Sequence, residues 1–171
     1  MRVLWLAMLC LLLGACGGGS GSNGASGDDG SVLTPEPAAG TARLTVGTLG
    51  PAADSVFYAA QFTLHLPAGV SLPTADGSSL LPDGMLAPAV SGSYAGASFL
   101  QPAGAGSGPL LLVNVAHPGG LTVGPLATLT CQVAAGAPPT ADAFTLESFS
   151  ARDGNGVVIP GITARLTLQT Q

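Results

Sequence analysis

The sequence predicts an all-β fold, a β-sandwich, and three observations predict it. Apolar and polar residues alternate with a period of two in several runs after residue 41, as they do in strands that bury one face. Glycine and proline separate these runs at 49–52, 66–69, 117–120 and 153–156, which is typical of turns. No amphipathic helix of useful length is visible. Many short strands joined by turns indicate a sandwich or a barrel.

Residues 1–15 have the organisation of a signal peptide. Arg2 supplies a positive charge, and an unbroken apolar run follows from 3 to 13. A run of this length is too short to cross a bilayer, which needs about 20 apolar residues. It suits the central part of a signal peptide instead. Two small residues, Gly14 and Ala15, then precede Cys16.

The end of this segment, Leu13-Gly14-Ala15-Cys16, resembles the lipobox of bacterial lipoproteins. The resemblance implies that the Cys16 thiol carries a diacylglyceryl group, that cleavage falls just before Cys16, and that the new amine is acylated. Gly17 follows where Asp is the usual retention signal for the inner membrane, so the resemblance favours the outer membrane. We therefore expect a cell-envelope protein held in membrane lipid through acylated Cys16. The alternative is an ordinary cleaved signal with a chance cysteine.

Residues 16–40 are expected to form a flexible tether. Gly, Ser, Asp and Pro dominate this segment, and it contains little that a core would bury. A flexible chain of this length spans about 27 Å on average, which holds a domain clear of lipid headgroups. The remaining residues, 41–171, suit one domain.

The charges and cysteines exclude several classes of function. The chain has no Lys, and loss of Arg2 with the signal leaves three arginines against nine acidic residues, a net charge of −6. Without a basic patch, nucleic acid is not expected as a partner. Without Lys, Schiff-base chemistry and a phosphate-binding P-loop are excluded. Cys10 leaves with the signal and Cys16 carries lipid, so Cys131 has no internal partner for a disulfide.

The alternating runs place the strands. In 56–66 the even positions are apolar, so Tyr58, Phe62 and Leu64 are expected on one buried face. The run 110–115 is apolar almost throughout, as in a central strand. The full set of expected strands is 43–46, 56–66, 110–115, 127–133, 144–146 and 162–169, with shorter ones at 90–94 and 97–100.

Three pieces of this domain carry a family resemblance: 57–64 running into 66–72, the run 124–133, and 144–146 followed by the acidic glycine turn 153–156. Together they are similar to a cohesin-like module of the carbohydrate-binding-module β-sandwich superfamily. The resemblance implies a jelly-roll sandwich that binds an extracytoplasmic protein or a polysaccharide. There are departures: Leu66-Pro67-Ala68 replaces an aromatic-Asp-Pro turn, and Cys131 lies where Phe is common. No dockerin-contacting residue carries over.

No catalytic constellation is found. The chain lacks a Gly-x-Ser-x-Gly elbow. Cys131 is a formal candidate nucleophile with His65 or His117 as base, but its parity places it inward with Leu129 and Val133. A buried thiol behaves as a small hydrophobe. We therefore expect no enzyme.

No cofactor or metal is expected either. His65 and His117 are isolated from other ligand-type residues and are interpreted as surface residues. Asp153 and Asn155 are the possible start of a calcium loop, but the twelfth position of such a loop needs Glu, and here it is Ala164. A plain turn is favoured.

Aromatic side chains are the remaining candidates for a site, because sugar rings stack on them. Trp5 leaves with the signal. Tyr94 and Phe99 are therefore candidates for a small ligand platform, with Phe57 and Phe149 as further outward candidates, but ordinary packing is favoured for all four. The sequence thus favours a protein-interaction module over a carbohydrate-binding or adhesion module.

Overall fold

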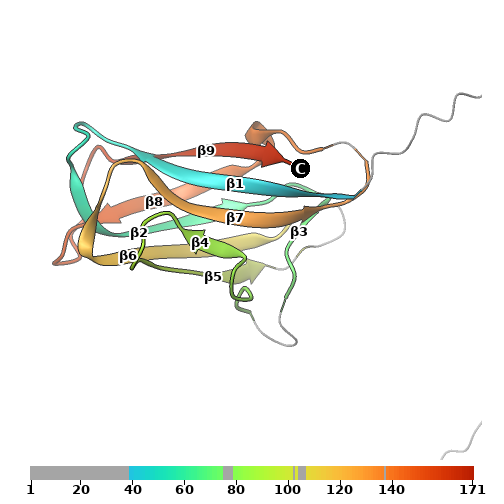
Figure 1. Ribbon diagram of the computed structural model, residues 1–171, viewed down its shortest axis with the longest axis horizontal. Coiled ribbons are helices and arrows are strands. Elements are labelled where there is room, and N and C mark those ends of the chain that lie inside the picture. The colour runs from blue at the N-terminus through green and yellow to red at the C-terminus, as the bar shows by residue number, and fades with distance from the viewer. Residues whose placement is uncertain (1–38, 75–78, 102, 104–106, 137) are drawn as a thin grey trace, which may run out of the picture. The chain divides into compact units, whose positions relative to one another are not determined.

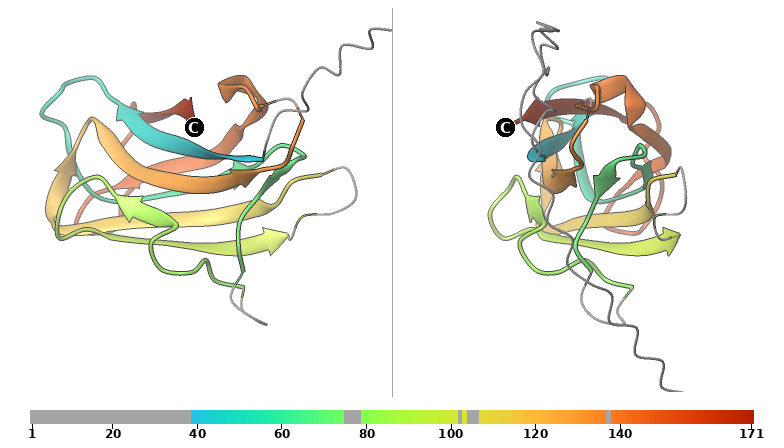
Figure 2. Two further views of the ribbon diagram at one scale, coloured as in Figure 1. Left: turned by 45° about the vertical axis from the view of Figure 1, so that its right-hand side comes forward. Right: turned by 90° about the vertical axis from the view of Figure 1, so that its right-hand side faces the viewer.

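The computed structural model describes residues 39–74, 79–101, 103, 107–136 and 138–171. Over these residues the chain forms two antiparallel sheets packed on each other (Figure 1). In Figure 2 (left), β1 and β7, cyan and orange, lie over β6 and β5, yellow and green. The predicted all-β sandwich is confirmed. The signal peptide, Cys16 and all but the last two residues of the predicted tether lie outside the described residues.

The first sheet, called sheet A below, has β1 and β7 at its centre and β9 at one edge. Two short strands, β3 and β4, both pair with β7. The bounds of its strands are β1 Gly40–Leu49, β3 Val70–Ser71, β4 Leu86–Pro88, β7 Pro125–Val133 and β9 Thr163–Thr170.

The second sheet, called sheet B below, has the order β5-β6-β2-β8. A short 3₁₀ helix, η1 (Ala141–Ala143), precedes β8. The bounds of its strands are β2 Val56–His65, β5 Tyr94–Gln101, β6 Leu110–Thr122 and β8 Thr145–Arg152.

The two ends of the described chain lie side by side. Ala42 of β1 is opposite Thr170 of β9, and Thr41 and Gln171 exchange backbone hydrogen bonds of 3.2 and 2.9 Å. The chain enters β1 at the right-hand end in Figure 1, whereas β2 and β5 begin, and β6 and β8 end, at the left-hand end. The two ends of the sandwich are therefore distinct surfaces.

Apolar side chains at alternating positions along the strands fill the space between the sheets, as predicted. Leu44 and Val46 of β1, Val113 and Val115 of β6, and Leu129 of β7 are at most 1% exposed. Burying such side chains is worth about 1.5–3 kcal/mol each. Strands 43–46, 110–115, 127–133 and 162–169 are confirmed by β1, β6, β7 and β9.

The parity predicted for the start of β2 is wrong. Phe57 is fully buried, while Tyr58 is 38% exposed. Phe57 pairs with Leu121 of β6, but Ala59 pairs with Ala116, so four residues of β6, 117–120, lie opposite one residue of β2. This bulge reverses the alternation and turns Tyr58 outward. The predicted turn at 117–120 is accordingly wrong, because β6 continues through it.

Phe149 is turned inward, in agreement with the packing that was favoured for it. Gln61 pairs with Ser150 and Thr63 with Glu147, so that Ser148 and Phe149 both lie opposite Phe62. Ser148 adopts a φ of 53° in this bulge, and the Phe149 ring stacks on Phe62 with 6.2 Å between ring centroids.

In the segment 71–107 the strands could be predicted only in part. Residues 90–93 form a turn, with Ser93 N–H donating to the Val90 carbonyl at 3.2 Å, so the strand expected at 90–94 is wrong. The strand at 97–100 lies inside β5. The short strands β3 and β4 were not predicted, because two or three residues show no period.

Candidate functional site

Cys131 lies in the core as predicted. Its side chain is fully buried, and desolvation raises the pKa of the thiol from 9.0 to about 12. The thiolate, which is the nucleophile, is therefore absent at neutral pH.

The two histidines lie far apart in the fold and make different contacts. His65 Nε2 is 3.5 Å from Glu147 Oε2, and both side chains are about half exposed. His117 Nδ1 accepts a hydrogen bond of 3.0 Å from Gly119 N–H. In the part of the chain that the structure describes, no group of three or more His, Cys, Asp or Glu is placed to hold a metal ion.

Asp153 organises the 153–156 turn. Its Oδ1 accepts hydrogen bonds from Asn155 N–H at 2.9 Å and Val157 N–H at 2.8 Å. Gly156, with φ of 83°, closes the turn by donating to the Asp153 carbonyl at 3.0 Å. Arg152 also donates to the Gly156 carbonyl at 2.9 Å. This is the pattern of an Asx turn, in agreement with the turn interpretation.

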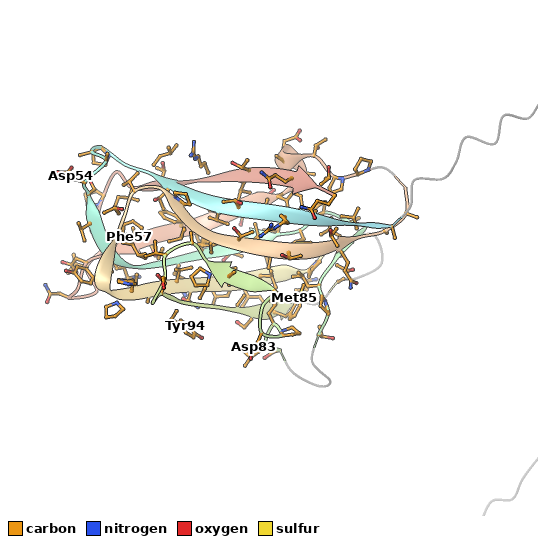
Figure 3. All side chains as sticks on the ribbon, in the orientation of Figure 1. Asp54, Phe57, Asp83, Met85 and Tyr94 are labelled. Atoms are coloured by element: carbon orange, nitrogen blue, oxygen red, sulfur yellow. The ribbon has the colours of Figure 1, made fainter. Side chains whose placement is uncertain are left out.

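The structure does not bring Tyr94 and Phe99 together. They are five residues apart on β5 and therefore point to opposite faces. Tyr94 lies on the surface and is 67% exposed, whereas the labelled Phe57 lies between the sheets (Figure 3). Phe99 is half-buried and packs against the core.

Tyr94 has a different aromatic neighbour, Tyr58. Both line one open groove of about 530 Å³ at the end of sheet B where β2 and β5 begin. His117 and Asp153 also line this tyrosine groove, and the other contributors are small: Ala59, Gly92, Ala116, Pro118, Gly154 and Gly156. The volume is within the range of about 300–1,000 Å³ that is usual for ligand sites.

The strand register fixes the positions of the two tyrosines. Tyr94 pairs with Ala116, and Ala116 pairs with Ala59, the residue after Tyr58. The tyrosines are thus two strands apart, about 10 Å between strand axes. The small side chains of Ala59 and Ala116 lie between them and leave the space open.

No protein-family model, curated protein or solved structure matches the chain. The described residues also contain no helix long and apolar enough to span a membrane. The chemistry of the site therefore has to be argued from its own side chains.

A second groove of about 530 Å³ lies at the other end of the sandwich, but it offers little chemistry. Proline, alanine and glycine residues form most of it, and Thr140 is its one polar side chain. Asp142, two residues along, is fully exposed, and a hydrogen bond from the Thr140 side chain lowers the pKa of its carboxyl. No aromatic or charged side chain lines this groove.

The outer face of sheet B, called the sheet B face below, continues from the tyrosine groove. Its residues alternate with the buried Ala60, Phe62 and Val113, so they point to solvent. The register aligns them in rows across β5, β6, β2 and β8. On β5, β6 and β2 they are mostly small or uncharged, namely Gln61, Thr63, Gly96, Ser98, Leu112 and Asn114. The edge strand β8 adds Ser150 and the charged side chains of Glu147, opposite Thr63, and Arg152, opposite Ala59.

Proposed function

We propose that this chain is a membrane-anchored lipoprotein that displays a non-catalytic, cohesin-like binding module. Acylated Cys16 is the anchor, residues 16–40 are the tether, and the sandwich binds another extracytoplasmic protein. The observation that supports this most is the chemistry of the sheet B face. On its strands β5 and β6 this face carries no charged side chain, and its acidic residue, Glu147, lies on the edge strand β8. Interface centres are depleted in charge.

Two features of the fold support a docking role over catalysis. The buried thiol of Cys131 has its pKa raised to about 12, and Asp153 uses its carboxylate to hold a turn. The two packed sheets hold the sheet B face on a rigid core, and rigid surfaces lose little entropy on binding. The net charge of the mature chain favours a partner with a basic patch, so that association should slow as salt rises.

A matched pair of variants tests the docking surface. Thr63→Arg places a charge in the middle of the sheet B face, and Thr45→Arg places the same charge on sheet A. Both threonines are half-buried and lie on central strands. Full-length protein in detergent is used to capture partners from envelope extracts.

We expect the same partner to be captured by the wild type and by Thr45→Arg, and to be lost with Thr63→Arg. Melting temperatures of both variants verify that each is folded. Capture that is insensitive to Thr63→Arg, or the absence of any saturable partner, would overturn the proposed docking surface.

The anchor is tested separately. Cys16→Ser removes the thiol that would carry lipid, so the variant should move from the detergent phase to the aqueous phase in phase partitioning. Wild-type protein that already stays in the aqueous phase would remove the lipoprotein proposal. Docking on the sheet B face does not depend on that result.

A second candidate function, binding of polysaccharide, is favoured by one observation. The chain has two tyrosines, and both line the same groove.

A further inference from the structure

We propose that the tyrosine groove is a carbohydrate site that takes the pyranose rings of a neutral oligosaccharide. This deepens the second candidate function, polysaccharide binding, and rests on it. It does not depend on protein docking, because the groove lies at one end of sheet B and Thr63 lies two rows away along β2. The inference rests on the two aromatic side chains, on the polar groups beside them and on the small residues between them.

Each tyrosine ring lies over a glycine. Three ring carbons of Tyr58 lie 3.7–3.9 Å from the position that a Cβ would take at Gly154, so the absence of a side chain there leaves room beside the ring. The Tyr94 ring folds back over Gly96 of its own strand, with Cζ 2.9 Å from the Cβ position of that glycine. Both rings therefore lie along the protein surface, and their exposed areas can receive the apolar face of a sugar ring.

The groove also presents both kinds of hydrogen-bonding group. Because His117 Nδ1 accepts the Gly119 N–H, the neutral imidazole carries its proton on Nε2. That nitrogen lies 3.4 Å from the Cβ position of Gly92, another lining residue. Asp153 adds carboxylate acceptors, and the two tyrosine hydroxyls both donate and accept. Sugar hydroxyls need such mixed partners.

The charges of the groove favour a neutral ligand. An anionic ligand would be repelled by the Asp153 carboxylate. A cationic ligand would gain little from that carboxylate, because Oδ1 already accepts two backbone N–H groups and Arg152 lies beside the turn. A separation of about 10 Å between the strands of the tyrosines suits a short oligosaccharide that contacts both rings.

The place of the groove in the fold agrees with this function. The groove lies at the left-hand end of the sandwich in Figure 1, where β2 and β5 begin, and the chain enters β1 at the opposite end. The groove therefore opens at the end of the sandwich away from the start of β1.

The chain provides its own probe of this site. Tyr58 and Tyr94 are the two tyrosines, and Trp5 is the one tryptophan. Tyrosine emission therefore comes from the groove alone, both in the mature chain that has lost Trp5 with the signal and in an uncleaved chain with Trp5→Leu. This protein, in detergent, is titrated with cellohexaose, maltohexaose, xylohexaose and chitohexaose, and with choline chloride as a cationic probe.

We expect a saturable change in emission with at least one of the four sugars and none with choline. Calorimetry should then show affinity weakened by about tenfold or more in Tyr58→Ala and in Tyr94→Ala. Gly96→Ala keeps both tyrosines but displaces the Tyr94 ring, so it should weaken binding too. Thr63→Arg should change the affinity by less than about twofold, since it lies outside the groove.

Three outcomes overturn the proposal: no saturable response to any of the four sugars, a response to choline instead, or sugar binding that survives both tyrosine substitutions in folded protein. Failure of protein docking is recognised separately, because it is measured with Thr63→Arg and envelope extracts. Melting temperatures verify folding, and Gly96→Ala covers the case in which a tyrosine substitution unfolds the chain.

Discussion

Both sheets bury an apolar inner face, but they differ in how regularly their strands pair. Sheet A pairs β1 with β9 without any shift of register, and its one bulge lies between Val46 and Gly47. Sheet B shifts register in each of its three strand pairs. The outer faces differ as well: sheet A carries threonines with Arg43 and Arg165, whereas sheet B carries the tyrosine groove.

The bulges mark the places where the strands depart from regular pairing. A bulge places an extra residue opposite a partner strand and re-aims its neighbours. In sheet B one bulge turns Tyr58 to the surface and another turns Phe149 onto Phe62. In sheet A the bulge is fixed by Thr48, which is 1% exposed and exchanges hydrogen bonds of 3.0 and 3.1 Å with Gly124. Sheet A is therefore the more regular sheet, and the bulges of sheet B are the ones that re-aim aromatic side chains.

The largest expected effect comes from charging the inner face of sheet A. Cys131→Asp places a carboxylate in a fully buried position without a partner, which should cost more than about 4 kcal/mol and prevent stable folding. Circular dichroism and urea unfolding measure this. A variant that folds with near wild-type stability would show that the core under sheet A is not continuous.

The next largest effect is a pH dependence. The pKa of the Cys131 thiol is raised from 9.0 to about 12, so between these values the unfolded chain loses the proton and the folded chain keeps it. Stability should therefore be unaffected by this group below about pH 9 and fall as pH rises toward about 12, by up to about 4 kcal/mol. Urea unfolding of wild type and Cys131→Ala over this range isolates the contribution; parallel pH profiles would contradict it.

Removing the side chain that fixes the bulge of sheet A should have a smaller effect. In the wild type, Gly124 N–H donates to the Thr48 hydroxyl at 3.0 Å. Thr48→Val removes this acceptor and leaves the N–H without that partner. The expected loss is about 1–3 kcal/mol. Thr48→Ser keeps the hydroxyl and is the matched control, so it should lose clearly less. A loss in Thr48→Ser as large as the loss in Thr48→Val would show that the methyl group contributes as much stability as the hydroxyl.

The contrast between regular and bulged pairing also explains which elements could be predicted from the sequence. Strands such as β1, β7 and β9 were predictable because their alternation is local and uninterrupted. The bulges were not, because they depend on which residues of a distant strand lie opposite. His117-Pro118-Gly119-Gly120 has the composition of a turn, yet it lies within β6.

The candidate site was likewise predictable only where it depends on local sequence. Tyr94, a candidate for the ligand platform, is exposed, but its groove neighbour is Tyr58, which is brought close by the pairing of β5, β6 and β2. Tyr58 was predicted to be buried because it shares the even positions of 56–66 with apolar residues. A single signal was available in the sequence, namely the neighbouring Phe57, which competes with Tyr58 for the inner face.

The smallest predicted effect concerns the bulge of sheet B and has an unusual sign. Ser148 is exposed and adopts a φ of 53°, a conformation that costs a residue with a Cβ about 1–3 kcal/mol. Ser148→Gly removes that cost but increases the entropy of the unfolded chain, so we expect a net gain of less than about 1 kcal/mol. Ser150→Gly is the matched control two residues along the strand, where φ is negative, and it should lose about 0.5–1 kcal/mol. Urea unfolding of both variants measures the difference in sign. If both glycines destabilise the chain equally, Ser148 stores no strain, and the bulge that orients Phe149 is as relaxed as the register of sheet A.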